Sequence, residues 1–160
     1  MSIGAAAAWA GPPSPDLRLG AYAPTGNAVV DQINGRLRDQ VRKFQCSFNR
    51  GTDVLEPGCD AKLAQLALML VDVRKQLAAA QVRHYHFEVS GHTDSSGDAA
   101  KNKSLSQKQA AVIVKALVAR GVPAGEIVAV GMGSALPLVK PDDTAAKKAL
   151  NRRFEVIVRP

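Results

Sequence analysis

The sequence is short of aromatic residues, and this bears on the kinds of partner it can recognise. Phe, Trp and Tyr make up 4% of its 160 residues. Proteins that bind nucleic acid commonly stack bases on clustered aromatic side chains, and no such cluster is present. The formal net charge is +7, but the basic residues are scattered from Arg18 to Arg159 rather than grouped. A soluble basic surface is therefore the simpler interpretation, and nucleic-acid binding is not predicted.

Long apolar runs are also missing. No stretch approaches the ~20 residues that a transmembrane helix needs, so no membrane span is predicted. The Ala-rich residues 5–10 follow no basic residue and are followed at once by Pro12 and Pro13, which makes a poor secretory signal. No cysteine near residue 20 could accept a lipid, so neither a leader nor an anchor is visible. Residues 1–28, rich in Ala, Gly and Pro without a period, are predicted to form a flexible tail.

Cysteine is limited to Cys46 and Cys59. This even count fits a disulfide formed in an oxidising compartment, and closing that loop would contribute roughly 3 kcal/mol in the chain-entropy model. Two reduced, buried thiols are the alternative. No C-x-x-C pattern is present, which leaves a redox motif or a structural zinc site without support.

An amphipathic helix is predicted over residues 29–43. Its apolar residues recur at three- and four-residue spacing, as a helix packed on one side requires. They are Val30, Ile33, Leu37, Val41 and Phe44. Packing on the domain is the ordinary outcome of such a stripe. Self-association, or binding of a partner protein, through this helix is the alternative.

The remaining chain alternates between strand and helix patterns. Strands are predicted over residues 44–48, 82–90, 127–130 and 154–158. One helix opens at Pro57-Gly58, and another runs from Ser104, which forms a capping-box pair with Gln107, to Gly121. The order β-α-β-α-β-β predicts an α/β (α+β) domain over residues 44–160, with one mixed sheet covered by helices on one face.

Asp94 is the main candidate for ligand chemistry. The strand ending at Gly91 delivers it onto a loop of small residues ahead of the next helix. A carboxylate facing the first turn of a helix can hold a small polar ligand. The alternative is a turn aspartate that caps nearby backbone N–H groups.

These residues also carry a family resemblance. Gly91-His92-Thr93-Asp94, Asn102, Leu105-Ser106 and Ala110 resemble the G-H-T-D…N-x-x-L-S-x-x-R-A signature of the OmpA-like peptidoglycan-associated domain. The stretches 48–57, 131–137 and 151–156 are similar to further motifs of that family, so that the resemblance covers residues 44–159. It implies a non-catalytic module without a cofactor, in the periplasm or cell envelope. Such a module anchors its owner to the cell wall through the diamino acid of the peptidoglycan stem peptide.

The resemblance also implies a set of binding residues. In the family, an aspartate at the position of Asp94 and an arginine at the position of Gln109 hold the charged ends of the diamino acid. Asn102, Leu105 and Ser106 match the segment that shapes the pocket. Gln109 lacks the arginine's charge, which could weaken binding by about 1.5–3 kcal/mol. A neighbouring cation could compensate, and the candidates are Lys101, Lys103, Arg152 and Arg153. The alternative is an OmpA-like scaffold or protein-interaction domain that has lost wall binding.

Metal binding and catalysis have less support. His84, His86 and Glu88 would share one face of a strand, but no further ligand can be identified, so no metal site is predicted. His92, Asp94, Ser95 and Ser96 include the residue types of a serine hydrolase, but G-x-S-x-G is absent. Catalytic triads are assembled from distant segments rather than from one loop, so no catalytic residue is predicted.

Overall fold

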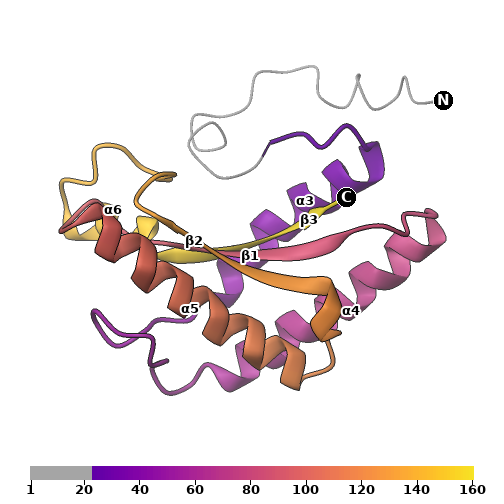
Figure 1. The fold of residues 1–160 in the computed structure, drawn as a ribbon, viewed down its shortest axis with the longest axis horizontal. Coiled ribbons are helices and arrows are strands. Elements are labelled where there is room, and N and C mark those ends of the chain that lie inside the picture. The colour runs from indigo at the N-terminus through magenta and orange to yellow at the C-terminus, as the bar shows by residue number, and fades with distance from the viewer. Residues whose placement is uncertain (1–22) are drawn as a thin grey trace.

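The computed structural model describes residues 23–160, and a three-stranded sheet lies at the centre of this part of the chain (Figure 1). In chain order the elements are α3 Ala28–Val41, the 3-10 turn η1 Arg42–Phe44, α4 Asp60–Ala79, β1 His86–His92, α5 Ala99–Ala119, the 3-10 turn η2 Ala124–Glu126, β2 Ile127–Gly133, α6 Ala145–Asn151 and β3 Arg153–Arg159. The strand order is β2-β1-β3, with β2 parallel and β3 antiparallel to β1. This confirms the predicted α/β class and its mixed sheet. Of the predicted flexible tail, residues 1–22 lie outside the described residues.

One face of the sheet carries the core. Because side chains alternate along a strand, every second residue of β1 and β3 meets the helices. The strand residues in this core are Phe87, Val89, Phe154, Val156 and Val158. Helix α4 buries five apolar residues at three- and four-residue spacing against this face: Leu63, Leu66, Leu70, Val73 and Leu77. Helices therefore cover the sheet on one face, as predicted.

Helix α3 packs on the domain, which is the first of the two interpretations of its apolar stripe. Its residues Val30, Ile33, Leu37 and Val41 are at most 2% exposed and join the core beside β3 and α4. The Asn27 side chain caps the helix by accepting hydrogen bonds from the N–H groups of Val29 and Val30. The apolar stripe is consequently not available to a second copy or to another protein.

Side-chain amides close the free edge of β3. In the antiparallel pair with β1, the peptide groups of Val158 and Phe154 point away from β1. Asn34 donates its amide N–H to the Val158 carbonyl (3.0 Å) and accepts the Val158 N–H (2.7 Å). Gln45 makes the same pair of bonds with Phe154. The strand predicted over residues 44–48 is therefore wrong: a side chain satisfies the edge where that strand would pair, and only an isolated bridge joins Phe48 to Leu55.

The free edge of β2 is closed in a similar way by α5. Gln107 accepts the Gly131 N–H (2.7 Å) and donates to the Ala129 carbonyl (3.0 Å). The Ser106 hydroxyl accepts the Gly133 N–H (2.9 Å). Helix and strand approach so closely that a Cβ atom at Gly131 would lie 2.5 Å from the Gln107 nitrogen. Glycine at this position thus sets the distance between α5 and β2.

Two helix predictions need correction. Helix α5 begins at Ala99 rather than near Ser104, because Asp98 caps it by accepting the Lys101 N–H, and Asp is among the strongest N-cap residues. Its end is as predicted, with Gly121 in the left-handed region (φ +111°) just beyond the last turn. Helix α6 was not predicted, because a helix of only seven residues carries too little periodicity to read.

Candidate ligand-binding site

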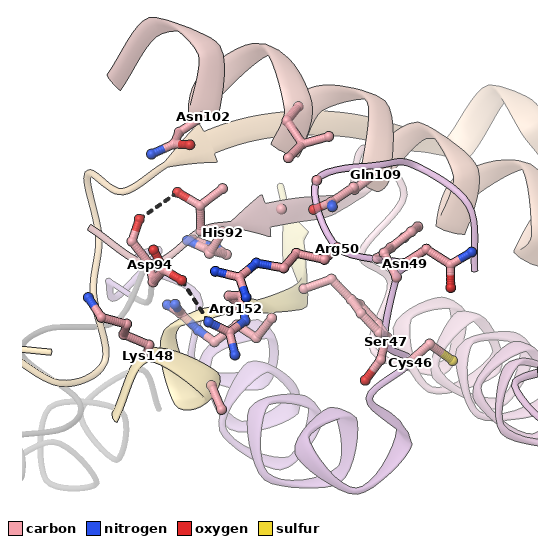
Figure 2. A pocket seen from close by; sticks show the side chains of 18 of the residues that line it. Cys46, Ser47, Asn49, Arg50, His92, Asp94, Asn102, Gln109, Lys148 and Arg152 are labelled. Atoms are coloured by element: carbon pink, nitrogen blue, oxygen red, sulfur yellow. Dashed lines mark hydrogen bonds and ion pairs between the residues drawn. The ribbon is translucent and has the colours of Figure 1, made fainter. Parts of the chain in front are cut away.

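A cavity of about 610 Å³ opens at the carboxyl end of β1 (Figure 2). Its walls come from the segment between η1 and α4, the end of β1 with the loop after it, one face of α5, helix α6 and the start of β3. Six of the binding residues considered from the sequence line it: Asp94, Asn102, Leu105, Gln109, Arg152 and Arg153. Residues up to 59 positions apart in sequence therefore share one cavity.

Ser106 is the predicted residue that does not reach the cavity. It is fully buried, and its hydroxyl donates to the Lys103 carbonyl while accepting the Gly133 N–H. Helix geometry explains this, since neighbouring residues point about 100° apart and Leu105 already faces the cavity. Ser106 therefore joins α5 to β2 rather than lining the cavity.

Asp94 is held in place on both of its carboxylate oxygens. One oxygen accepts the Ser96 N–H (2.8 Å) and the other accepts a guanidinium N–H of Arg152 (2.7 Å). The side chain is 13% exposed. Burial opposes ionisation, but the hydrogen bonds from Arg152 and Ser96 outweigh it, and the net effect lowers the pKa of Asp94. Asp94 is therefore both a turn cap and an ionised carboxylate with unused lone pairs facing the cavity.

The loop that carries Asp94 is fixed from three sides. Asn102 in the first turn of α5 donates to the Ser96 carbonyl (2.8 Å). Lys148 from α6 donates to the Ser96 hydroxyl (3.1 Å). Asp142 accepts hydrogen bonds from the N–H and the hydroxyl of Ser95, which lower its pKa to about 2. The carboxylate is thus presented on a preorganised loop rather than on a free one.

Gln109 faces the segment before α4. Its amide donates to the Thr52 carbonyl (2.9 Å). Arg50, two residues earlier in that segment, lines the same cavity, and Figure 2 shows its side chain reaching toward the side where Asp94 and Arg152 lie. The sequence did not assign a role to Arg50, since its position depends on how an irregular segment folds against α5. Lys148 was missed because α6 was missed.

Arg153 lines the cavity but is engaged elsewhere. It is buried, and its guanidinium donates to the Glu155 carboxylate (2.6 Å) and to the carbonyls of Asn151 and Leu136. Burial lowers the pKa of Arg153, an effect that the paired Glu155 opposes. Its role is to join the start of β3 to the loop before α6.

His92 forms part of the cavity floor. It is 2% exposed, and its Nε2 lies 2.9 Å from the Ser90 hydroxyl. Within the described residues its Nδ1 has no hydrogen-bond partner. Burial, and next the nearby charge of Arg153, lower the pKa of His92 to about 3, so the ring is neutral at pH 7. Asp94, Ser95 and Ser96 make their hydrogen bonds with other groups, so the serine-hydrolase residue types do not assemble around His92.

Cys46 and Cys59 are joined in a disulfide, with their Cα atoms 5.7 Å apart. The bond closes the segment that carries Arg50 and Thr52, and Cys46 itself lines the cavity. A crosslink at its two ends limits the movement of this segment relative to α5. The structure therefore contains the disulfide, and not the two reduced thiols that were the alternative.

Residues 23–160 contain neither a metal-binding cluster nor a helix suited to cross a membrane. No group of three or more His, Cys, Asp or Glu side chains in this part of the chain is arranged to hold a metal ion. Glu88 pairs with Arg159 instead of joining His84 and His86. Over the same residues, no helix combines the length and the apolar character that crossing a membrane requires.

Comparison with known proteins places the domain in a family. A model described as "OmpA family" matches residues 47–152. Outer membrane porin F of Pseudomonas fluorescens is 36% identical over 116 residues, covering 72% of this chain and 32% of the porin. The peptidoglycan-binding protein ArfA of Mycobacterium tuberculosis is 39% identical over 70 residues, covering 44% of this chain and 21% of ArfA. The chain therefore spans about a third or less of these two relatives.

A solved structure shows the same fold. The crystal structure of the peptidoglycan-associated lipoprotein from Burkholderia pseudomallei is similar with a TM-score of 0.54 and 27% sequence identity. The similarity covers 71% of this chain and 86% of the lipoprotein chain. Since the family model alone matches well over half of the sequence, the protein belongs to the OmpA family.

Proposed function

We propose that this domain binds the diamino acid of peptidoglycan stem peptides in the cavity at Asp94. The binding is non-catalytic and needs no cofactor. It would anchor an envelope protein to the cell wall from the periplasmic side.

The observation that carries this proposal is the pairing of charges in one cavity. Asp94 is ionised and fixed, which suits it to accept hydrogen bonds from a ligand ammonium. Arg50 and Lys148 line the same cavity and offer positive charge to a ligand carboxylate. A ligand residue with an ammonium at one end and a carboxylate at the other matches both.

Membership of the OmpA family supports the same ligand. The family resemblance supports an ammonium-binding role for Asp94, and the names of ArfA and of the Burkholderia lipoprotein both refer to peptidoglycan. Gln109 is the reason to keep a second candidate, an OmpA-like scaffold that docks other envelope proteins. The charges in the cavity weigh against it, because docking of another protein does not require an ionised carboxylate and an unpaired arginine side by side in one cavity.

Co-sedimentation with purified insoluble peptidoglycan sacculi tests the proposal. We expect the domain to pellet with sacculi, and Asp94→Ala and Asp94→Asn to remain in the supernatant. Asp94→Asn keeps an acceptor for the Ser96 N–H, so it removes the charge while leaving the turn in place. Asp143→Ala is the matched control, since Asp143 is an exposed carboxylate that pairs with Lys147 outside the cavity.

Two results would decide against wall anchoring. A wild-type domain that stays in the supernatant at low salt would favour the scaffold function. Equal pelleting of the wild type and Asp94→Asn would show that any wall binding occurs elsewhere, for example through the scattered basic surface.

A further inference from the structure

We infer that Arg50 binds the carboxylate of the ligand, in place of the arginine that the family carries at the position of Gln109. The inference rests on the proposed function. It names the residue that binds the ligand carboxylate, which the sequence left open. It also gives Gln109 a different role, as the residue that positions the Arg50 segment.

Gln109 is already engaged. Its amide nitrogen donates to the Thr52 carbonyl (2.9 Å), and the group carries no charge. An uncharged donor forms a weaker hydrogen bond to a carboxylate than a guanidinium does, and it cannot form the two parallel bonds of an arginine. Gln109 therefore cannot replace the family's arginine by itself.

Most other cations near the cavity have partners. Arg152 donates to Asp94, and Arg153 donates to Glu155 and to two carbonyls. Lys148 donates to the Ser96 hydroxyl. The two other cations considered from the sequence, Lys101 and Lys103, do not line the cavity although they lie on the first turns of α5.

Arg50 is the cation that remains. Its side chain lines the cavity and makes no hydrogen bond or ion pair with any of residues 23–160. Figure 2 shows it extending from its segment across the cavity. A planar guanidinium with five N–H donors and no partner can form a bidentate pair with a carboxylate that enters beside Asp94.

The segment that carries Arg50 is built to hold it there. Backbone bonds close a turn from Asn49 to Val54 (2.8 Å) and from Thr52 to Asn49 (2.9 Å). The Cys46–Cys59 disulfide ties the two ends of the segment together. Gln109 then fastens the turn to α5 through Thr52, so it acts on the ligand through the position of Arg50.

The test uses two synthetic stem peptides that differ in one group. The first ends in the diamino acid with a free ammonium and a free carboxylate. In the second that carboxylate is a carboxamide. Binding of each is measured by calorimetry with the wild type, Arg50→Gln, Gln109→Ala, the double variant and Asp94→Asn. Arg83→Gln is the control, because Arg83 is an exposed arginine outside the cavity.

We expect Arg50→Gln to bind the carboxylate peptide about 10- to 100-fold more weakly than the wild type does. Its affinity for the carboxamide peptide should change by less than about threefold, as should the affinity of Arg83→Gln for either peptide. Gln109→Ala should lose part of the same selectivity. The double variant should be little weaker than Arg50→Gln alone, because Gln109 acts through Arg50.

The outcomes separate this inference from the proposed function. If Arg50→Gln binds the carboxylate peptide as the wild type does while Asp94→Asn loses binding, Arg50 has no role and the proposed function stands. Additive losses in the double variant would overturn the positioning role of Gln109. If the wild type binds neither peptide, the proposed function fails and the role of Arg50 fails with it.

Discussion

Asn34→Ala tests how the free edge of β3 is closed. Asn34 is 1% exposed, and its amide makes two hydrogen bonds to the backbone of Val158, which is itself fully buried. Alanine would leave one buried N–H and one buried carbonyl without partners. Each unsatisfied group costs about 1–3 kcal/mol, and alanine returns roughly 0.5 kcal/mol through its better helix propensity. Some water could enter the space, so the expected net loss is about 2–4 kcal/mol.

Urea denaturation followed by circular dichroism measures this loss. With a slope of about 2 kcal/mol per molar urea, the midpoint should fall by roughly 1–2 M. Gln32→Ala is the matched control, because Gln32 is an exposed amide on the same helix, and its midpoint should barely move. Asn34→Asp should be worse than Asn34→Ala at neutral pH, since a carboxylate has no N–H for the Val158 carbonyl and its charge would be buried. A midpoint for Asn34→Ala within error of that for Gln32→Ala would refute the edge-closing role.

Three further predictions concern stability. Gly131→Ala should destabilise the domain by about 1–3 kcal/mol, measured by thermal unfolding, because its Cβ would lie 2.5 Å from the Gln107 nitrogen on α5; an unchanged melting temperature would contradict the close approach. His92 has its pKa lowered from 6.5 to about 3, so the unfolded state takes up a proton first as the pH falls. The free energy of unfolding should then drop by roughly 2 kcal/mol from pH 7 to pH 5 relative to His92→Gln, and parallel pH profiles would refute this. Reduction of Cys46–Cys59 should lower stability by about 2–4 kcal/mol, and the double serine variant should be insensitive to reductant.

Elements with a strong period were predicted well from the sequence. The core positions of α4 recur every three or four residues over about four turns, and in β1 the buried Phe87 and Val89 alternate with the half-buried His86 and Glu88. Both patterns reflect burial on one side only, which is a property of the sequence itself. The start of α5 was wrong by five residues because Asp98 and Ser104 are both good caps, and only the fold decides between them.

The strand over residues 44–48 shows a different limit. Its alternating pattern was real, but the hydrogen bonds that would have made it a strand come from the side chain of Gln45. Gln45 can bond to the edge of β3 only because the fold brings it next to Phe154, 109 positions away in the sequence. A local sequence pattern contains no information on the distance between such segments.

The candidate site was predicted unevenly for the same reason. Asp94, Asn102 and Leu105 lie within twelve residues of one another, so one motif placed them together. The bond from Gln109 to Thr52 joins an irregular segment to a helix, and Arg50 lies in that segment, so no local pattern placed it in the cavity. Ser106 belongs to the same motif but does not line the cavity, because a motif specifies residues without stating which of them face the cavity.

The central claim is that Asp94 holds the ammonium of the stem diamino acid. The most direct measurement is calorimetric titration with a stem peptide that carries the free ammonium and with a matched peptide in which hydrogen replaces it. The wild type should bind the ammonium peptide at least about tenfold more tightly, as a charge-assisted hydrogen bond requires, and Asp94→Asn should bind both peptides equally weakly. Equal affinity of the wild type for the two peptides, or a preference that survives in Asp94→Asn, would contradict the claim.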